Sequence, residues 1–90
     1  MINMTTYRLI AFGYADYGFF NRTFYKAKRE WAYNCYQNCL ADPDFDGVVL
    51  IEINHEDWRV IEEYGTEGYS IGCGPHGNFT VSKAPELVML

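Results

Sequence analysis

Two apolar stretches separated by a short polar turn constrain the fold of this chain most strongly. Residues 48–53 (VVLIEI) and 58–64 (WRVIEEY) are rich in the β-branched and aromatic side chains typical of strands. Residues 54–57 (NHED) between them have the polar character of a turn. A four-residue turn aligns the apolar positions of the two stretches on one face, which predicts an antiparallel hairpin. The expected cross-strand pairs are Ile53 with Trp58, Ile51 with Val60, Leu50 with Ile61 and Glu52 with Arg59.

The remaining segments predict two further strands, one helix and a glycine-rich region. Residues 5–13 and 19–23 predict strands, and residues 24–41 predict a helix that ends before Pro43. Residues 65–78 predict a glycine-rich loop with a short strand at 69–71, followed by an edge strand at 79–82 and an apolar tail at 85–90. We therefore expect one α+β domain over residues 1–90, with an antiparallel sheet in ββαββ order and one helix packed on one face. On helical spacing, the core-facing residues would be Phe24, Ala27, Trp31, Cys35 and Cys39.

The composition excludes a disordered chain and a helical membrane span. Hydrophobic residues make up 49% of the chain and aromatic residues 18%, which is too apolar for intrinsic disorder. The longest apolar run, residues 48–51, is far shorter than the roughly 20 residues of a membrane helix. Three cysteines and a first segment without a secretory signal indicate a reducing compartment. We therefore expect a cytoplasmic protein that does not act at a membrane.

Charge is distributed unevenly along the chain. The formal net charge is −5, but residues 1–30 hold five basic and two acidic side chains, while residues 31–90 hold two basic and ten acidic ones. This acidic balance argues against direct nucleic-acid binding, which needs Lys and Arg to neutralise phosphates. An alternative is a nucleic-acid-binding domain that uses the basic cluster of the first third, which consists of Arg22, Lys26, Lys28 and Arg29.

No residue pattern indicates catalysis. His55 and His76 are the general-base candidates of ordinary pKa, and neither has a Ser or Cys nucleophile beside it in the sequence. Residues 42–47 (DPDFDG) match the start of a calcium loop, but position twelve of that loop would be Ile53 instead of glutamate. These residues are better explained as the turn between helix and strand. We therefore expect a non-enzymatic protein without a cofactor.

Four soft ligands leave a small zinc-binding module open as an alternative. Cys35 and Cys39 are four residues apart on the predicted helix, and Cys73 and His76 are three apart in the glycine-rich loop. Together they could surround a tetrahedral zinc ion if folding brings the loop to the helix. Core packing is the competing explanation for the two helical cysteines.

A partner-binding surface is the function class that the residues favour most. Acidic side chains from residue 42 onward would steer a basic partner, and exposed tyrosines would supply apolar anchors. The expected partner is a larger protein with a basic surface, and a homodimer stays open. The candidate binding residues are Asp42, Asp44, Asp46, Glu56, Asp57, Glu62, Glu63 and Glu67, with Tyr25, Tyr33 and Tyr36.

The chain resembles the small phage-borne proteins that disable bacterial defences, anti-CRISPR proteins among them. The resemblance covers the whole chain and consists of about ninety residues, an acidic balance, a strand–helix–strand layout and no catalytic pattern. It implies an inhibitor that occupies a nucleic-acid or partner site on a larger protein. No individual residue role follows from it.

Overall fold

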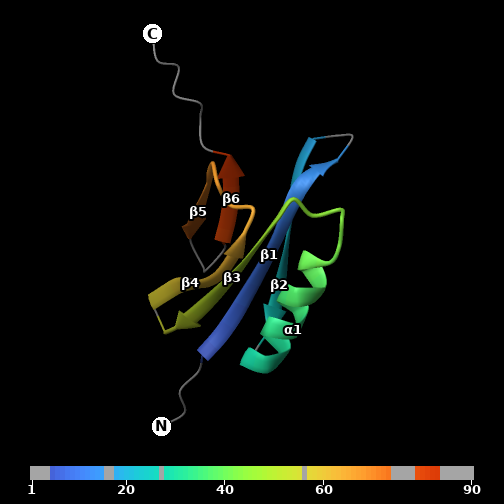
Figure 1. Ribbon diagram of the computed structural model, residues 1–90. Coiled ribbons are helices and arrows are strands. Elements are labelled where there is room, and N and C mark those ends of the chain that lie inside the picture. The colour runs from blue at the N-terminus through green and yellow to red at the C-terminus, as the bar shows by residue number, and fades with distance from the viewer. Residues whose placement is uncertain (1–4, 16–17, 27, 56, 74–78, 84–90) are drawn as a thin grey trace.

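A computed structural model describes residues 5–15, 18–26, 28–55, 57–73 and 79–83. It contains one helix, α1 (Arg29–Leu40), and six strands (Figure 1). The strands are β1 (Thr5–Ala15), β2 (Gly18–Lys26), β3 (Gly47–Asn54), β4 (Asp57–Tyr64), β5 (Tyr69–Cys73) and β6 (Phe79–Lys83). The expected α+β class is confirmed. The last two strands extend the expected element order and form a second sheet.

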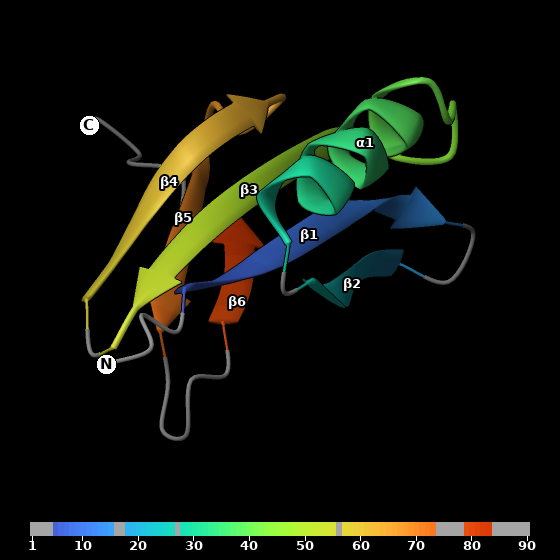
Figure 2. The ribbon, with the colours of Figure 1, turned by 90° about the horizontal axis from the view of Figure 1, so that it is seen from below.

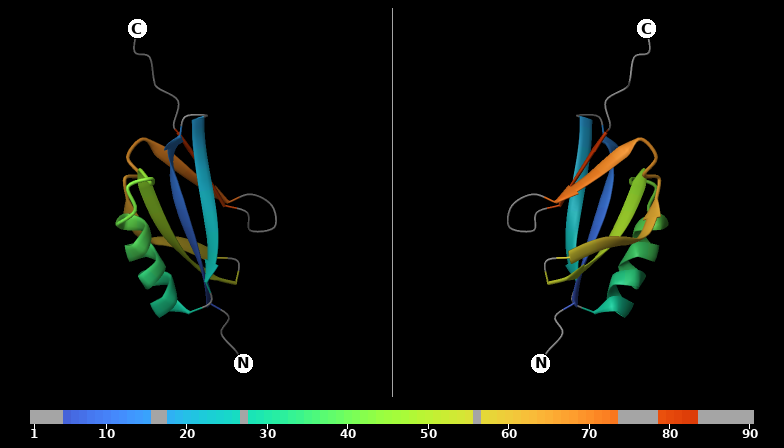
Figure 3. Two further views of the ribbon diagram at one scale, coloured as in Figure 1. Left: turned by 90° about the vertical axis from the view of Figure 1, so that its right-hand side faces the viewer. Right: turned by 90° about the vertical axis from the view of Figure 1, so that its left-hand side faces the viewer.

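The molecule has three layers around a central antiparallel sheet. Its strand order is β2-β1-β3-β4, and α1 covers one face (Figure 2). The hairpin of β5 and β6 crosses the opposite face (Figure 3), so both faces are covered over part of their area. The expected edge strand at 79–82 is β6, which pairs with β5 and not with the main sheet. Residues 85–90 lie outside the described residues.

Each face of the central sheet has its own apolar core. On the helix side, Leu9 and Leu50 of the sheet pack against Ala32 and Tyr36 of α1. On the hairpin side, Phe12 packs against Tyr69 at a ring-centroid distance of 4.7 Å. Alternate residues of β1 and β3 enter opposite cores. Because both faces of β3 are buried, residues 48–51 form one continuous apolar run in the sequence.

The predicted register of the β3–β4 hairpin is confirmed at three of its four pairs. Ile53 pairs with Trp58, Glu52 with Arg59 and Ile51 with Val60. The fourth pair is wrong, because a β-bulge shifts the register and Leu50 lies opposite Glu62. Ile61 is therefore the extra residue of β4, and its side chain packs against the helix-side core.

The helix begins five residues later than the sequence predicted. Residues 24–26 continue β2, where Phe24 pairs with Leu9 and packs against the helix-side core from the sheet. The core-facing residues of α1 are consequently Ala32, Tyr36 and Cys39, while Trp31 is 57% exposed. Placing Trp31 in the core was wrong. The small side chain of Ala32 lets the helix approach the sheet closely at this position.

Gly47 and Gly65 allow the α1–β3 loop to pack closely against the end of β4. A Cβ on Gly47 would lie 2.2 Å from Cζ of Phe12, and one on Gly65 would lie 2.2 Å from the backbone oxygen of Asp46. Gly65 also has a φ of +69°, which other residues rarely adopt. These two glycines allow segments far apart in the sequence to touch.

Candidate functional site

Six of the eight predicted acidic residues come from two segments that lie side by side. One segment is the α1–β3 loop, and the other is the end of β4 with the turn that follows it. The contact between Gly65 and Asp46 joins the two segments, and Val48 pairs with Tyr64 directly beside it. We call these six residues the acidic surface: Asp42, Asp44, Asp46, Glu62, Glu63 and Glu67.

Two aspartates of the acidic surface also shape the loop that carries them. Asp44 donates its backbone N–H to Oδ1 of Asp42 at 2.9 Å, which is an Asx-type turn. Tyr14 donates its backbone N–H to Oδ2 of Asp46 at 3.1 Å, and the Asp46 N–H donates to the Phe12 carbonyl at 2.8 Å. The DPDFDG motif is therefore a loop that closes onto the end of β1. Asp44 itself is exposed.

The other two predicted acids do not join the acidic surface. Asp57 is exposed at the first residue of β4, at the opposite end of that strand from Tyr64. Glu56 lies outside the described residues. The seven predicted acidic residues that the structure describes thus divide into the six of the acidic surface and a separate Asp57.

The predicted tyrosines do not line the acidic surface as expected. Tyr36 is only 4% exposed, so the expectation that it is an exposed anchor was wrong. Burial raises the pKa of its hydroxyl, and the nearby Glu62 and Glu63 raise it further. Tyr33 is half-buried, and Tyr25 is exposed on β2, the opposite edge strand from β4.

Tyr64, which was not among the predicted site residues, is 62% exposed at the end of β4. Strand alternation and the bulge place it on the same face as Glu62. The sequence signal for an exposed Tyr64 was its position directly after Glu62 and Glu63 in the predicted strand. Tyr64 is the large aromatic side chain best placed to anchor a partner at the acidic surface.

The predicted basic cluster is divided by the fold. Lys26, Lys28 and Arg29 lie at the end of β2 and the start of α1, whereas Arg22 lies 6.0 Å from the Phe45 ring in the α1–β3 loop. Two cations of the first group lie over aromatic rings. Lys28 lies 4.8 Å from the Trp31 ring, and Arg29 lies 5.5 Å from the Tyr33 ring.

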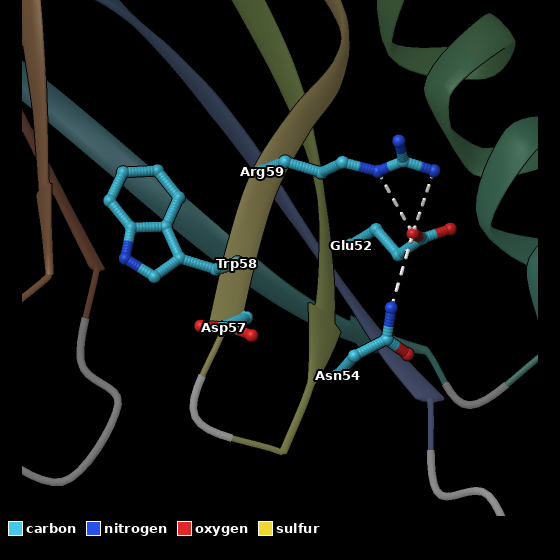
Figure 4. Close-up of a pocket in the computed structure, with 5 residues that line it drawn as sticks. All are labelled: Glu52, Asn54, Asp57, Trp58 and Arg59. Atoms are coloured by element: carbon cyan, nitrogen blue, oxygen red, sulfur yellow. Dashed lines mark hydrogen bonds and ion pairs between the residues drawn. The ribbon is translucent and has the colours of Figure 1, made fainter.

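A small pocket at the β3–β4 hairpin contains the one buried carboxylate among the described residues. Glu52 is 7% exposed and accepts hydrogen bonds from Nε of Arg59 at 3.1 Å and Nδ2 of Asn54 at 3.4 Å (Figure 4). The Tyr7 hydroxyl donates to it at 3.4 Å. Asp57 and Trp58 complete the lining. The pocket measures about 80 Å³, below the roughly 300 Å³ at which small-molecule sites begin.

The described residues contain no cluster of three or more metal-ligating side chains. Cys39 is buried and Cys35 is half-buried in the helix-side core, as expected from core packing. Burial raises the pKa of the Cys39 thiol, which makes it a poor nucleophile. The Cys73 side chain and His76 lie outside the described residues, so the zinc alternative stays a prediction.

Comparison with protein-family models, with curated proteins and with solved structures finds no match to this chain. Within the part of the chain that the structure describes, no helix has the length and apolar character to cross a membrane. The acidic surface is therefore characterised by its own geometry alone.

Proposed function

We propose that this chain is a non-enzymatic binding protein that docks on a basic surface of a larger protein through its acidic surface. One observation carries the proposal. Six acidic residues come from two adjoining segments, with Glu62 and Glu63 on opposite faces of β4, and none of the six forms an ion pair within the described residues. Such a concentration of like charge destabilises the isolated fold and attracts a basic partner.

The charges at the two ends of α1 support the proposal. Negative charge stabilises a helix at its N-terminus and positive charge at its C-terminus. Here Lys28 occupies the N-cap without a side-chain cap hydrogen bond, Arg29 and the acidic Glu30 follow in the first turn, and the last turn has no basic residue. Asp42 stands just beyond the C-terminal end. Helix stability thus does not favour Asp42 at this end, where its Oδ1 accepts the Asp44 N–H in the loop turn. A basic partner would offset this unfavourable charge.

The proposed mode of action is inhibition by occupancy in a reducing, intracellular compartment. A surface with six carboxylates can replace the phosphates of a nucleic acid on a basic protein, because both neutralise Lys and Arg side chains. The resemblance to anti-CRISPR proteins implies the same mode. Tyr64 would supply the apolar contact that simple charge attraction lacks.

A capture experiment with matched variants tests the proposal. The tagged chain is incubated with a bacterial lysate that contains defence-system proteins, and the captured proteins are compared between variants. The test variant is Glu62→Lys/Glu63→Lys. The control is Glu30→Lys/Asn34→Lys/Gln37→Lys, which changes the net charge equally but at exposed positions of α1 outside the acidic surface.

The proposal expects a protein captured by the wild type and the control but lost from the test variant. Added nucleic acid should release it, and its association rate should fall about tenfold between low and physiological salt. A partner that is bound equally by both variants would contradict the role of the acidic surface.

A further inference from the structure

The two outer strands of the central sheet carry opposite charges. The strand order places β2 at one edge and β4 at the other, and each pairs with one neighbour among the described residues (Figure 2). β2 contains Arg22 and Lys26 and no acid. β4 contains three acids and Arg59, whose charge is balanced by Glu52. An edge strand presents unpaired backbone N–H and C=O groups to any strand that can add to it.

The directions of β2 and β4 allow them to pair as antiparallel strands between two copies. Each neighbouring pair in the sheet is antiparallel, so β2 and β4 also run in opposite directions. If a second copy continued the sheet beyond β2, its β4 would therefore lie antiparallel to β2. The helices of both copies would then cover the same face of the extended sheet.

One register matches charge and aromatic side chains on the correct faces. Lys26 pairs with Tyr7, which faces the helix side, and Asp57 lies two residues from Arg59 on the same face. Placing Lys26 opposite Asp57 joins opposite charges on the helix side. It also places Tyr25, which is 62% exposed, opposite Trp58, which is 38% exposed, on the other face. Both kinds of cross-strand pair stabilise a sheet.

We propose that a second copy of this chain binds edge to edge, with residues 57–60 of its β4 paired antiparallel to residues 23–26 of β2. The bulge at Ile61 ends the regular pairing after Val60. Since the two edges differ, the contact is heterologous and leaves a free edge on each side. The assembly therefore grows with concentration into chains of several copies and does not stop at a symmetric dimer.

Sedimentation velocity over a concentration series up to about 1 mM tests this contact, using purified full-length chain at low and high salt. Wild type is expected to show a rising sedimentation coefficient that high salt reduces. Lys26→Glu and Asp57→Lys should each raise the apparent dissociation constant about tenfold, because each places like charges opposite one another. The equimolar mixture of the two variants and the doubly swapped chain should both regain association. Circular dichroism checks that every variant is folded.

A matched control reverses two exposed charges outside the proposed contact of residues 23–26 and 57–60, Lys28→Glu and Glu67→Lys, and should associate like wild type. Wild type that stays monomeric throughout, a mixture that fails to regain association, or sensitivity to Lys26→Glu without sensitivity to Asp57→Lys would each overturn the proposal. The proposed function fails separately, because its test variant changes Glu62 and Glu63 and leaves the Lys26–Asp57 pair intact.

Discussion

Gly47 is a position where the addition of one methyl group is expected to reduce stability strongly. In Gly47→Ala, the new Cβ would lie 2.2 Å from Cζ and 2.6 Å from Cε2 of Phe12. Carbon atoms in contact are normally about 3.5–4.0 Å apart, so the ring must move by more than about 1 Å. Phe12 is fully buried and packs against Tyr69, which leaves no space for that movement. We expect a loss of about 3 kcal/mol, near the upper end for overpacked cores.

Urea unfolding followed by circular dichroism measures this loss. With a slope of about 1–1.5 kcal/mol per molar urea for a domain of this size, the midpoint should fall by about 2–3 M. The matched control is Gly72→Ala, whose Cβ would meet only Oγ1 of Thr80 at an ordinary 3.6 Å. That control should change stability by less than about 0.5 kcal/mol.

A double-mutant cycle tests the physical cause. Phe12→Leu removes the ring atoms that clash, so Gly47→Ala should cost at least about 1 kcal/mol less in the Phe12→Leu background than in the wild type. Part of the loss should remain, because the new Cβ also lies 2.9 Å from the backbone oxygen of Gly65. If the two substitutions were additive within about 0.5 kcal/mol, the clash with Phe12 would not be the cause.

Three further predictions concern charged and titratable groups. Arg59→Ala should lower the free energy of unfolding by about 1–3 kcal/mol, measured by urea unfolding, because it leaves the buried Glu52 carboxylate without its cation. Lys28→Asp should raise the thermal midpoint, with a gain of about 1 kcal/mol, because it supplies the missing N-cap acceptor and the favourable charge sign; an unchanged midpoint would speak against the helix argument. Burial raises the pKa of Tyr36, so its stabilisation is complete below about pH 10 and is lost as the pH rises beyond that value. Tyr36→Phe should therefore reduce the alkaline loss of stability in a pH series.

The register of the β3–β4 hairpin could be predicted because its determinants are local. Turn length and alternation within residues 48–64 place Glu52 opposite Arg59 and Ile53 opposite Trp58. The bulge could not be predicted, because Ile61 enters the helix-side core only once α1 covers that face. The packing of β5 and β6 on the other face likewise depends on contacts such as Phe12 with Tyr69, which are far apart in the sequence.

The helix start was mispredicted because residues 24–26 fit both patterns. Phe24 is apolar at a helical interval from later core positions, yet it is also apolar at the alternate spacing of β2. Residues 24–26 form a strand and not a helix because they pair with residues 7–9 of β1, which are distant in the sequence. The later start changes which side of α1 meets the sheet, so Tyr36 enters the core and Trp31 leaves it.

This outcome separates the two parts of the binding hypothesis. The aromatic part depended on helix phase, so one displaced boundary placed Tyr36, which was expected to be exposed, in the core. The acidic part depended on a turn motif and a strand end, which have local signals in the Asp42–Asp44 turn and in Gly65 with its positive φ. Charge also acts over about 8 Å at physiological salt, so small errors in orientation matter less to it than to an aromatic contact. Charge reversals at Glu62 and Glu63 are therefore a more secure first test of partner binding than any aromatic substitution, and Tyr64 is the aromatic residue to test next.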